Sequence, residues 1–326
     1  MKNLKRRFFI KSSSLLAGGL VLPSFSINRM ANNSNNKKLK VSVVGCGGRG
    51  TGAAVQALRA DENVELVAMA DAFKDRLENS LNAIKQEMEG EKNIDIKEKN
   101  KLTGFDGYKK AIDLADVVIL ATPPGFRPLH FKYAIENDKH VFMEKPVATD
   151  SNGVRQVLET AKIANEKKLN VVVGLQRRYQ YSYLNILKQV RRGVVGKITS
   201  GQVRWNGAGV WVRERKPNQT EMEYQMRNWY YFNWLCGDHI VEQHIHNIDV
   251  ANWFLDEYPI SAQGMGGREV RKGIDHGEIF DHHFVEFKYA SGAIISSQCR
   301  HQPGTHRQEN EFLVGTKGKV DITNKN

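Results

Sequence analysis

The chain has 326 residues, of which 40% are hydrophobic and 26% are charged, with three cysteines and a formal net charge of +12. This composition predicts a soluble globular protein with room for two domains, and so few, scattered cysteines exclude a disulfide framework and a C-x-x-C metal site. Half of the net positive charge lies before residue 30, and no block of lysine and arginine interleaved with aromatic residues follows, so the sequence indicates no nucleic-acid partner.

Residues 1–36 are predicted to be a signal peptide and a linker. Arg6 and Arg7 form a twin-arginine pair, followed by apolar residues, Lys11 and a mildly apolar stretch over 12–22. This order resembles a Tat export signal and predicts a periplasmic or otherwise exported protein, with cleavage between about residues 25 and 31. The apolar run is too short for a stable membrane span. The alternative is a disordered basic tail.

A glycine-rich turn follows the first predicted strand. Val41, Val43 and Val44 form a β-branched run, and three glycines then fall at G-x-G-x-x-G spacing before a helix-like stretch over 51–60. In a dinucleotide-binding turn these glycines permit the turn, the approach of a pyrophosphate and the close packing of the helix. The predicted cofactor-binding residues here are Gly45, Gly47, Gly48, Arg49 and Gly50. The alternative is an ordinary glycine-rich turn.

The second predicted strand, residues 64–70, ends in Asp71, which lies 21 residues after Gly50. An acid at this offset accepts hydrogen bonds from the adenosine ribose hydroxyls and repels the 2′-phosphate of NADP, so the sequence favours NAD as the cofactor. The alternative role of Asp71 is the N-cap of the next helix. Lys74 and Arg76 follow closely and leave tolerance of NADP open.

Strands and helices alternate up to about residue 175. Residues 73–99 are charged and mostly helix-like, residues 108–114 are a short helix candidate, and the apolar strand 115–122 stops at Pro123 and Pro124. The carboxyl ends of parallel strands line the ligand crevice of an open sheet, so Thr122 and Pro123 are predicted to lie beside the cofactor. A turn without a ligand is the alternative.

A helix over 128–136 and a strand over 140–143 lead into Glu144-Lys145-Pro146. A lysine at the carboxyl end of a strand in this crevice is well placed for proton transfer beside a bound nicotinamide. Glu144 is predicted to hold Lys145 or to face the cofactor. Taken alone, E-K-P is a common surface turn.

These motifs together resemble the Gfo/Idh/MocA family, named after glucose-fructose oxidoreductase and inositol dehydrogenase. The resemblance rests on G-C-G-G-R-G at 45–50, A-D at 70–71, A-T-P-P at 121–124 and E-K-P at 144–146, and it continues through 174–179 and 193–198. It implies an α/β fold, with an N-terminal Rossmann NAD-binding domain over 38–175 and an α+β domain over 176–326 built on a large, open, mainly antiparallel sheet. It also implies that Lys145 is a catalytic or proton-relay residue that touches nicotinamide and substrate.

The pattern beyond residue 150 predicts helices over 150–168 and 183–192, a strand over 170–174, and later strands over 198–205, 262–270, 284–289, 293–299 and 311–314. The resemblance implies that this second domain binds the substrate and forms a homo-oligomer through its sheet. The turn at 315–318 resembles the G-T-x-G turn of the family, after which its members continue further. Because the chain ends at Asn326, the sequence leaves open that it is a fragment.

The densest polar cluster of the sequence runs from Gly237 to Asp249. If this run is helical, Glu242, His246 and Asp249 share one face. The family commonly has D-x-x-x-H here, with the histidine on the hydroxyl that is oxidised, and Glu242 replaces that aspartate. The resemblance therefore predicts Lys145, His246 and Glu242 as catalytic residues.

Two other interpretations of the histidines stay open. His239, Glu242, His244 and His246 are all zinc-ligand types, but His244 and His246 face apart on a helix and no H-E-x-x-H is present, so no metal is predicted. The histidines could instead pack against the sheet and form hydrogen bonds. Aromatic residues crowd just before this run, and flat rings suit the face of a pyranose, although core packing explains many of them. The predicted substrate contacts are Arg178, Trp229 and His246.

The sequence thus predicts an exported NAD-dependent oxidoreductase that acts on a hydroxyl group of a sugar or glycoside. Free NAD is expected to be scarce outside the cytoplasm, so the cofactor is predicted to be held tightly and recycled. The alternative is a redox-neutral, NAD-dependent glycoside hydrolase or lyase, and a third possibility is a non-catalytic sugar or cofactor binder.

Overall fold

The computed structural model describes residues 38–90 and 92–323. The predicted signal peptide and linker lie outside the described residues. Among the described helices, none combines the length and the apolar character that crossing a membrane requires.

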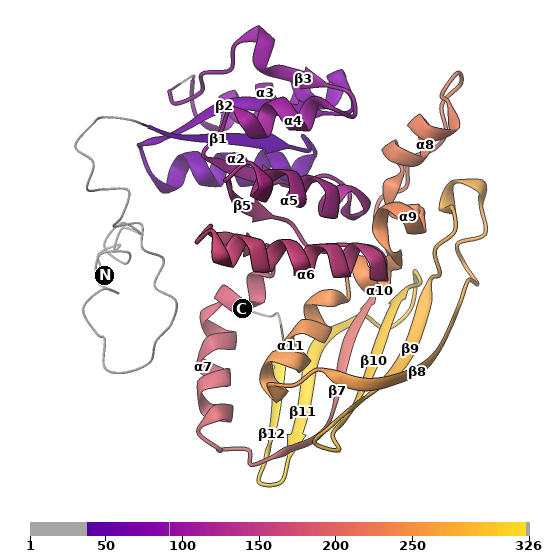
Figure 1. Ribbon diagram of the computed structural model, residues 1–326. Coiled ribbons are helices and arrows are strands. Elements are labelled where there is room, and N and C mark those ends of the chain that lie inside the picture. Colours follow the sequence, from indigo (N-terminus) through magenta and orange to yellow (C-terminus); the bar gives the residue numbers. More distant parts are fainter. Residues whose placement is uncertain (1–37, 91, 324–326) are drawn as a thin grey trace, which may run out of the picture. The chain divides into compact units, whose positions relative to one another are not determined.

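The first sheet has six parallel strands in the order β3-β2-β1-β4-β5-β6 (Figure 1). This is the strand order of a doubly wound dinucleotide-binding fold, whose ligand crevice lies at the carboxyl ends of the strands. The strands are β1 (Leu39–Val44), β2 (Val64–Asp71), β3 (Lys101–Thr103), β4 (Val117–Leu120), β5 (His140–Met143) and β6 (Val171–Val173). The prediction of a Rossmann domain is therefore confirmed.

Helices cover both faces of this sheet. α2 (Gly48–Ala60) and α3 (Lys74–Glu87) share one apolar core with the strands, and α4 (Gly107–Asp113), α5 (Arg127–Glu136) and α6 (Ser151–Glu166) share another. Strands buried on both faces need apolar side chains at successive positions. The runs V-V in β1 and V-V-I-L in β4 meet this requirement, and Val43 and Val118 are fully buried.

The second sheet has six strands in the order β12-β11-β7-β10-β9-β8 (Figure 1). They are β7 (Ile198–Gly207), β8 (Pro259–Gly267), β9 (His282–Tyr289), β10 (Ile294–His301), β11 (Gln308–Gly315) and β12 (Lys319–Thr323). β7 and β10 are parallel, and the other neighbouring strands are antiparallel. α7 (Tyr181–Arg191) and α11 (Ile245–Leu255) pack their apolar side chains on this sheet. The predicted mainly antiparallel second domain is confirmed.

A helical excursion lies between β7 and β8. It contains α8 (Glu221–Arg227), the 3-10 turn η5 (Trp229–Tyr231), α9 (Asn233–Cys236) and α10 (Asp238–Glu242). Its apolar residues form a small core of their own, against which Ala72, Phe73 and Phe126 of the first domain pack. The two sheets are therefore joined by side-chain packing as well as by the chain.

Three predicted elements differ from the structure. The run 237–249 is not one helix, because α10 ends at Glu242 and α11 begins at Ile245. The helix predicted within 73–99 stops at Glu87, and the 3-10 turn η2 (Glu98–Asn100) precedes a short strand, β3, that the sequence analysis missed. The strand predicted over 262–270 begins and ends three residues earlier, as β8.

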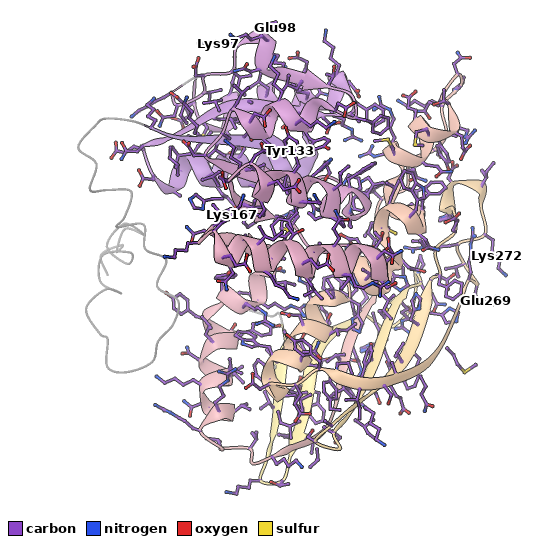
Figure 2. The ribbon with its side chains drawn as sticks, in the orientation of Figure 1. Lys97, Glu98, Tyr133, Lys167, Glu269 and Lys272 are labelled. Atoms are coloured by element: carbon purple, nitrogen blue, oxygen red, sulfur yellow. The ribbon has the colours of Figure 1, made fainter. Side chains whose placement is uncertain are left out.

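Charged side chains on the outside of the molecule form exposed ion pairs. Glu269 and Lys272, both labelled in Figure 2, form an exposed ion pair with 3.2 Å between Nζ and Oε2. Ion pairs in water contribute little to stability, because solvent screens them and ordering two long side chains costs entropy. The Glu269–Lys272 pair is therefore expected to contribute little to the free energy of unfolding.

Candidate active site

The glycine turn between β1 and α2 is built for close approach of a ligand to the backbone. Gly45 has a φ of +98°, and a Cβ atom on it would lie 2.4 Å from the Thr122 nitrogen. A Cβ on Gly50 would lie 2.0 Å from the Gly45 oxygen, whereas a Cβ on Gly47 or Gly48 would meet nothing within 4 Å. Gly45 and Gly50 are therefore required by packing, and Gly47 and Gly48 leave open space in front of the first turn of α2.

Asp71 is held in place by this turn. Its Oδ2 accepts a hydrogen bond from the Cys46 nitrogen at 2.8 Å, and its Oδ1 accepts one from the Phe73 nitrogen at 2.9 Å. Burial raises the pKa of the carboxyl group above its usual value, and the two backbone donors and the charge of Arg76 oppose that rise. The carboxylate is thus fixed at the carboxyl end of β2, where ribose hydroxyls bind in this fold.

A cavity of about 710 Å³ lies over the glycine turn. Its walls include most of the cofactor-binding residues predicted from the sequence, namely Gly45, Gly47, Gly48, Arg49, Asp71, Thr122 and Pro123. The first turn of α2 contains no acidic residue, so its free N–H groups and the helix dipole favour an anion there. Open backbone at two glycines, an anion-binding helix end and a fixed carboxylate fit a dinucleotide with its diphosphate on α2.

The cofactor turn is tied to the end of β5 by an ion pair. The Arg49 guanidinium binds Glu144 Oε1 through Nη2 at 2.6 Å and through Nε at 3.2 Å. Glu144 is 5% exposed, while the Arg49 side chain is largely exposed. Glu144 therefore pairs with Arg49 of the glycine turn, and its role beside the cofactor stays a prediction.

Lys145 reaches from the first domain into the second. Its Nζ donates a hydrogen bond to Glu242 Oε1 at 2.7 Å and another to the Glu242 main-chain oxygen. Both side chains are almost buried. Lys145 and Glu242 are 97 residues apart in the sequence, so only the tertiary fold brings this pair together.

His246 lies in the same polar centre. Its ring stacks on Trp205 with 6.0 Å between the ring centroids, and its Nδ1 and Glu242 Oε2 are buried atoms without a hydrogen-bond partner among the described residues. Burial and, to a smaller extent, the charge of Lys145 lower the pKa of His246 to about 3. The centre thus combines a cationic donor, a carboxylate oxygen with free lone pairs and a neutral imidazole.

Two family models match the chain in the same order as its two sheets. "Oxidoreductase family, NAD-binding Rossmann fold" matches residues 39–175, and "GFO/IDH/MocA C-terminal domain" matches residues 183–321. Together they account for most of the chain. The chain belongs to the Gfo/Idh/MocA family.

The names of similar proteins refer to different activities. The chain is 25% identical to inositol 2-dehydrogenase of Rhizobium meliloti over 272 residues, which are 82% of this chain and 71% of that protein. It is 24% identical to a glycosyl hydrolase family 109 protein of Shewanella baltica over 248 residues, covering 70% of this chain but only 50% of that protein.

The fold is similar to a crystal structure of myo-inositol dehydrogenase from Lactobacillus casei in complex with NAD(H) and myo-inositol. The TM-score is 0.65 at 18% sequence identity, over 89% of this chain and 75% of that chain. Identity this low supports a shared fold alone.

Two of the predicted substrate contacts lie elsewhere than beside His246. The Arg178 guanidinium makes two hydrogen bonds to Asp249, of 2.8 and 2.7 Å, and lies 5.1 Å from the Trp253 ring. Trp229 lines the dinucleotide cavity. Their role as substrate contacts remains a prediction.

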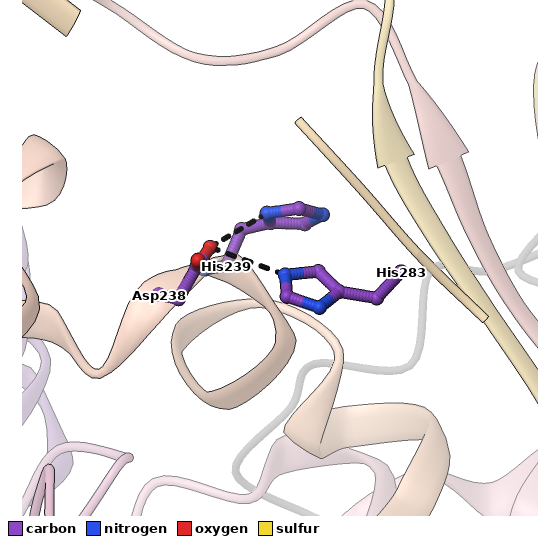
Figure 3. A group of neighbouring side chains, drawn as sticks. All are labelled: Asp238, His239 and His283. Atoms are coloured by element: carbon purple, nitrogen blue, oxygen red, sulfur yellow. Dashed lines mark hydrogen bonds and ion pairs between the residues drawn. The ribbon is translucent and has the colours of Figure 1, made fainter. Parts of the chain in front are cut away.

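Among the described residues, the four possible zinc ligands predicted from the sequence do not form one cluster. His244 binds Ser297 Oγ through Nε2 at 2.8 Å, away from His246. Instead, His239 and His283 both face Asp238, with 2.9 and 3.4 Å to its Oδ1, as Figure 3 shows. The ligand atoms of these three residues lie within 4.8 Å of one another.

Hydrogen bonds connect part of this cluster, although His239 Nε2 and His283 Nε2 are buried without a hydrogen-bond partner among the described residues. Asp238 also accepts a hydrogen bond from the Phe280 nitrogen at 2.8 Å, and its pKa lies well below the usual range because the two histidines offset the effect of burial. Burial lowers the pKa of His239, so its neutral ring donates to the carboxylate, and the nearby Arg271 cation opposes a second positive charge. His283, in β9, approaches His239 with 4.7 Å between the ring centroids.

Sequence reasoning missed the support beneath His246. Arg177, which is 2% exposed, forms ion pairs with Glu311 and Glu309 of β11 and lies 5.7 Å from the Trp205 ring. Glu311 also accepts hydrogen bonds from Asn247 at 2.6 Å and from Tyr183 at 3.0 Å. The G-L-Q-R-R-Y motif at 174–179 contains Arg177, but no pattern in the sequence indicated which residues it pairs with.

Proposed function

We propose that this Gfo/Idh/MocA chain is an NAD-dependent oxidoreductase that oxidises a secondary hydroxyl group of a sugar, a glycoside or a related cyclic polyol. The observation that carries the proposal is the meeting of Lys145, at the end of β5, with Glu242 and His246 of the second domain. Lys145 follows Glu144, which holds the cofactor turn, so the polar centre adjoins the dinucleotide site.

Each residue of the centre has a separate role. The neutral His246 ring accepts the proton of the hydroxyl group that is oxidised through Nδ1, which has no hydrogen-bond partner among the described residues. Lys145 donates a hydrogen bond to the substrate oxygen as that oxygen gains negative charge, and Glu242 fixes the direction of Nζ. The unpartnered Glu242 Oε2 accepts a hydrogen bond from a neighbouring hydroxyl group.

The cofactor residues support NAD. Gly47, Gly48 and the first turn of α2 would hold the diphosphate, and Asp71 would accept hydrogen bonds from the adenosine ribose. When bound, nicotinamide supplies the hydride acceptor, which no side chain can provide.

The first test has two steps. Purified protein is denatured, and the supernatant is examined by mass spectrometry for NAD. The protein is then incubated with NAD and a panel of cyclitols, sugars and aryl glycosides, and NADH is followed by its absorbance at 340 nm. NADH formation with at least one member of the panel is expected, and a protein that neither contains nor binds NAD would contradict the proposal.

A redox-neutral glycoside hydrolase or lyase is the second candidate. The similarity to a glycosyl hydrolase family 109 protein favours it, and so does a cavity for the cofactor that residues of both domains line. Release of the aglycone from an aryl glycoside without added NAD would support this candidate, whereas a stable keto sugar with stoichiometric NADH supports the oxidoreductase.

Export through the Tat pathway is part of the proposal. It is supported by the Arg6-Arg7 pair and the apolar stretch that follows it. Replacement of both arginines by lysine is expected to leave the protein in the cytoplasm, as measured by cell fractionation. Homo-oligomer formation is supported by the edge strand β8, where Ile260 and Met265 are 65% and 82% exposed, and sedimentation velocity would test it.

A further inference from the structure

The dinucleotide cavity has an outer wall that the first domain does not supply. Trp211, Arg213, Met226, Arg227 and Trp229, all from the excursion between β7 and β8, line the cavity together with the glycine turn and Asp71. We call these five residues the outer wall. The adenosine half of a dinucleotide in a Rossmann fold is otherwise expected to lie against the first domain alone.

Two contacts fix which end of the cavity the outer wall covers. The Arg227 guanidinium lies 4.0 Å from the Phe73 ring, and it binds Asp75 through two hydrogen bonds of 3.0 Å each. Phe73 and Asp75 lie two and four residues after Asp71, which is expected to bind the ribose of the adenosine half. Neither Lys145 nor His246 lines this cavity, so the outer wall covers the adenosine end and not the nicotinamide end.

The chemistry of the outer wall suits a purine with nearby phosphates. Trp211 offers a ring that is packed edgewise on Trp229 at 5.8 Å, and the Arg213 guanidinium lies 5.0 Å from the Trp211 ring. Flat guanidinium and indole groups bind aromatic bases by stacking.

Positive charge at this wall is not neutralised by the protein. Among the described residues, neither Arg213 nor Arg76 forms a salt bridge with a carboxylate, although both line the cavity. Burial lowers the pKa of Arg213, and the charges of Arg76 and Arg227 lower it further. Like charges brought this close repel one another, so an anionic ligand between them is favoured.

We propose that the outer wall is the second half of an adenosine-binding site, in which Trp211 and Arg213 stack on the adenine and the Arg227–Asp75 pair holds the wall closed. This inference rests on the proposed function, since the ligand is the adenosine half of the same dinucleotide. Release of the cofactor then requires the Arg227–Asp75 pair to open, which retains the cofactor between turnovers.

Calorimetric titration of the full protein tests the wall. The ligands are AMP and ADP-ribose, which contain the adenosine half, and nicotinamide mononucleotide, which does not. Trp211→Ala and Arg213→Ala are suitable variants because both side chains are exposed enough to be removed without unfolding the core, and Trp211 is 40% exposed. Arg215→Ala is the matched control, because Arg215 belongs to the same segment, pairs with Glu221 and does not line the cavity.

Each test variant is expected to bind AMP and ADP-ribose about 3-fold to 30-fold more weakly, the range that corresponds to stacking of a cation or indole on a base. Affinity for nicotinamide mononucleotide and all affinities of Arg215→Ala are expected to stay at wild-type values. Wild-type affinity of both test variants for AMP and ADP-ribose would overturn the inference while leaving the proposed function standing. Failure of the wild-type protein to bind ADP-ribose or NAD would instead overturn the proposed function.

The closing pair is tested by the rate at which bound NADH leaves. Asp75→Asn removes the charge that Arg227 binds and is expected to raise the dissociation rate, followed by stopped-flow fluorescence, about 5-fold. Glu87→Gln is the control, because Glu87 forms an exposed ion pair with Arg59 in the same domain. An unchanged rate in Asp75→Asn would remove the closing role of the pair.

Discussion

The two halves of the proposed active site are built by different means. The cofactor half is made mainly of backbone, since Gly47 and Gly48 expose the first turn of α2 and Asp71 is positioned by two main-chain N–H groups. The substrate half is made of side chains that come from distant segments, as in the contact between Lys145 and Glu242. A backbone site needs a short local motif, whereas a side-chain site needs the whole fold to be correct.

The substrate half should be the more sensitive to loss of a single functional group. Lys145→Met is expected to lower turnover by about 10²-fold to 10⁴-fold, because the hydrogen bond to the reacting oxygen is lost. NAD affinity, measured by calorimetry, is expected to change little, since the cavity is lined by other residues. Lys272→Met, at an exposed ion pair, is the control and should keep wild-type turnover. Equal losses of turnover in the two variants would show that Lys145 has no special role in the reaction.

The support of the substrate half should matter more for stability than any exposed pair. Arg177→Met leaves Glu311 buried without its cation, and loss of one partner of a buried ion pair costs about 3–5 kcal/mol. The free energy of unfolding, measured by urea denaturation, is expected to fall by that amount. Glu269→Gln should change it by less than about 0.5 kcal/mol, because solvent screens that exposed pair. Similar values for the two variants would show that Arg177 is not a structural support.

Two glycines of the cofactor half should separate folding from binding. Gly50→Ala places a Cβ atom 2.0 Å from the Gly45 oxygen, so unfolding is expected to become easier by about 1–3 kcal/mol. Gly47→Ala meets no protein atom within 4 Å, so stability should hold while NAD affinity falls roughly 10-fold, because the methyl group enters the space for the diphosphate. Unchanged NAD affinity in Gly47→Ala would argue against a diphosphate at this turn.

Buried histidines predict how stability depends on pH. Burial lowers the pKa of His130, His244 and His246 to about 3, against an unfolded value near 6.5. The unfolded chain then binds more protons below pH 6.5, so stability is highest above that pH and falls as the pH is lowered towards 3.

Each of these histidines contributes a slope of roughly 1.4 kcal/mol per pH unit in this window. Urea denaturation between pH 7.5 and 5 measures the sum over all groups that titrate there, which include Glu311, because burial raises its pKa to about 6. His244→Gln should make the dependence shallower by one such contribution. A flat profile would mean that these histidines are charged or accessible in the folded protein.

The sequence by itself determined most of the first domain. The G-x-G-x-x-G spacing, Asp71 and the buried strands predicted the parallel sheet and the cofactor turn, because close backbone approach and burial on both faces restrict the residue types along a short stretch. The resemblance carried by E-K-P and by the run before Asp249 pointed to Lys145, Glu242 and His246, although no local pattern could show that they meet.

Only the tertiary structure decided how the second half is assembled. The break between α10 and α11 turns Glu242 towards Lys145, Arg177 finds its partners on β11, and Trp211 and Arg213 return to the cofactor cavity of the first domain. These contacts join residues that are tens of residues apart. The geometry of these contacts depends on how whole helices and strands pack. Periodicity along the chain predicts which face of an element is buried, but it does not predict which other element covers that face.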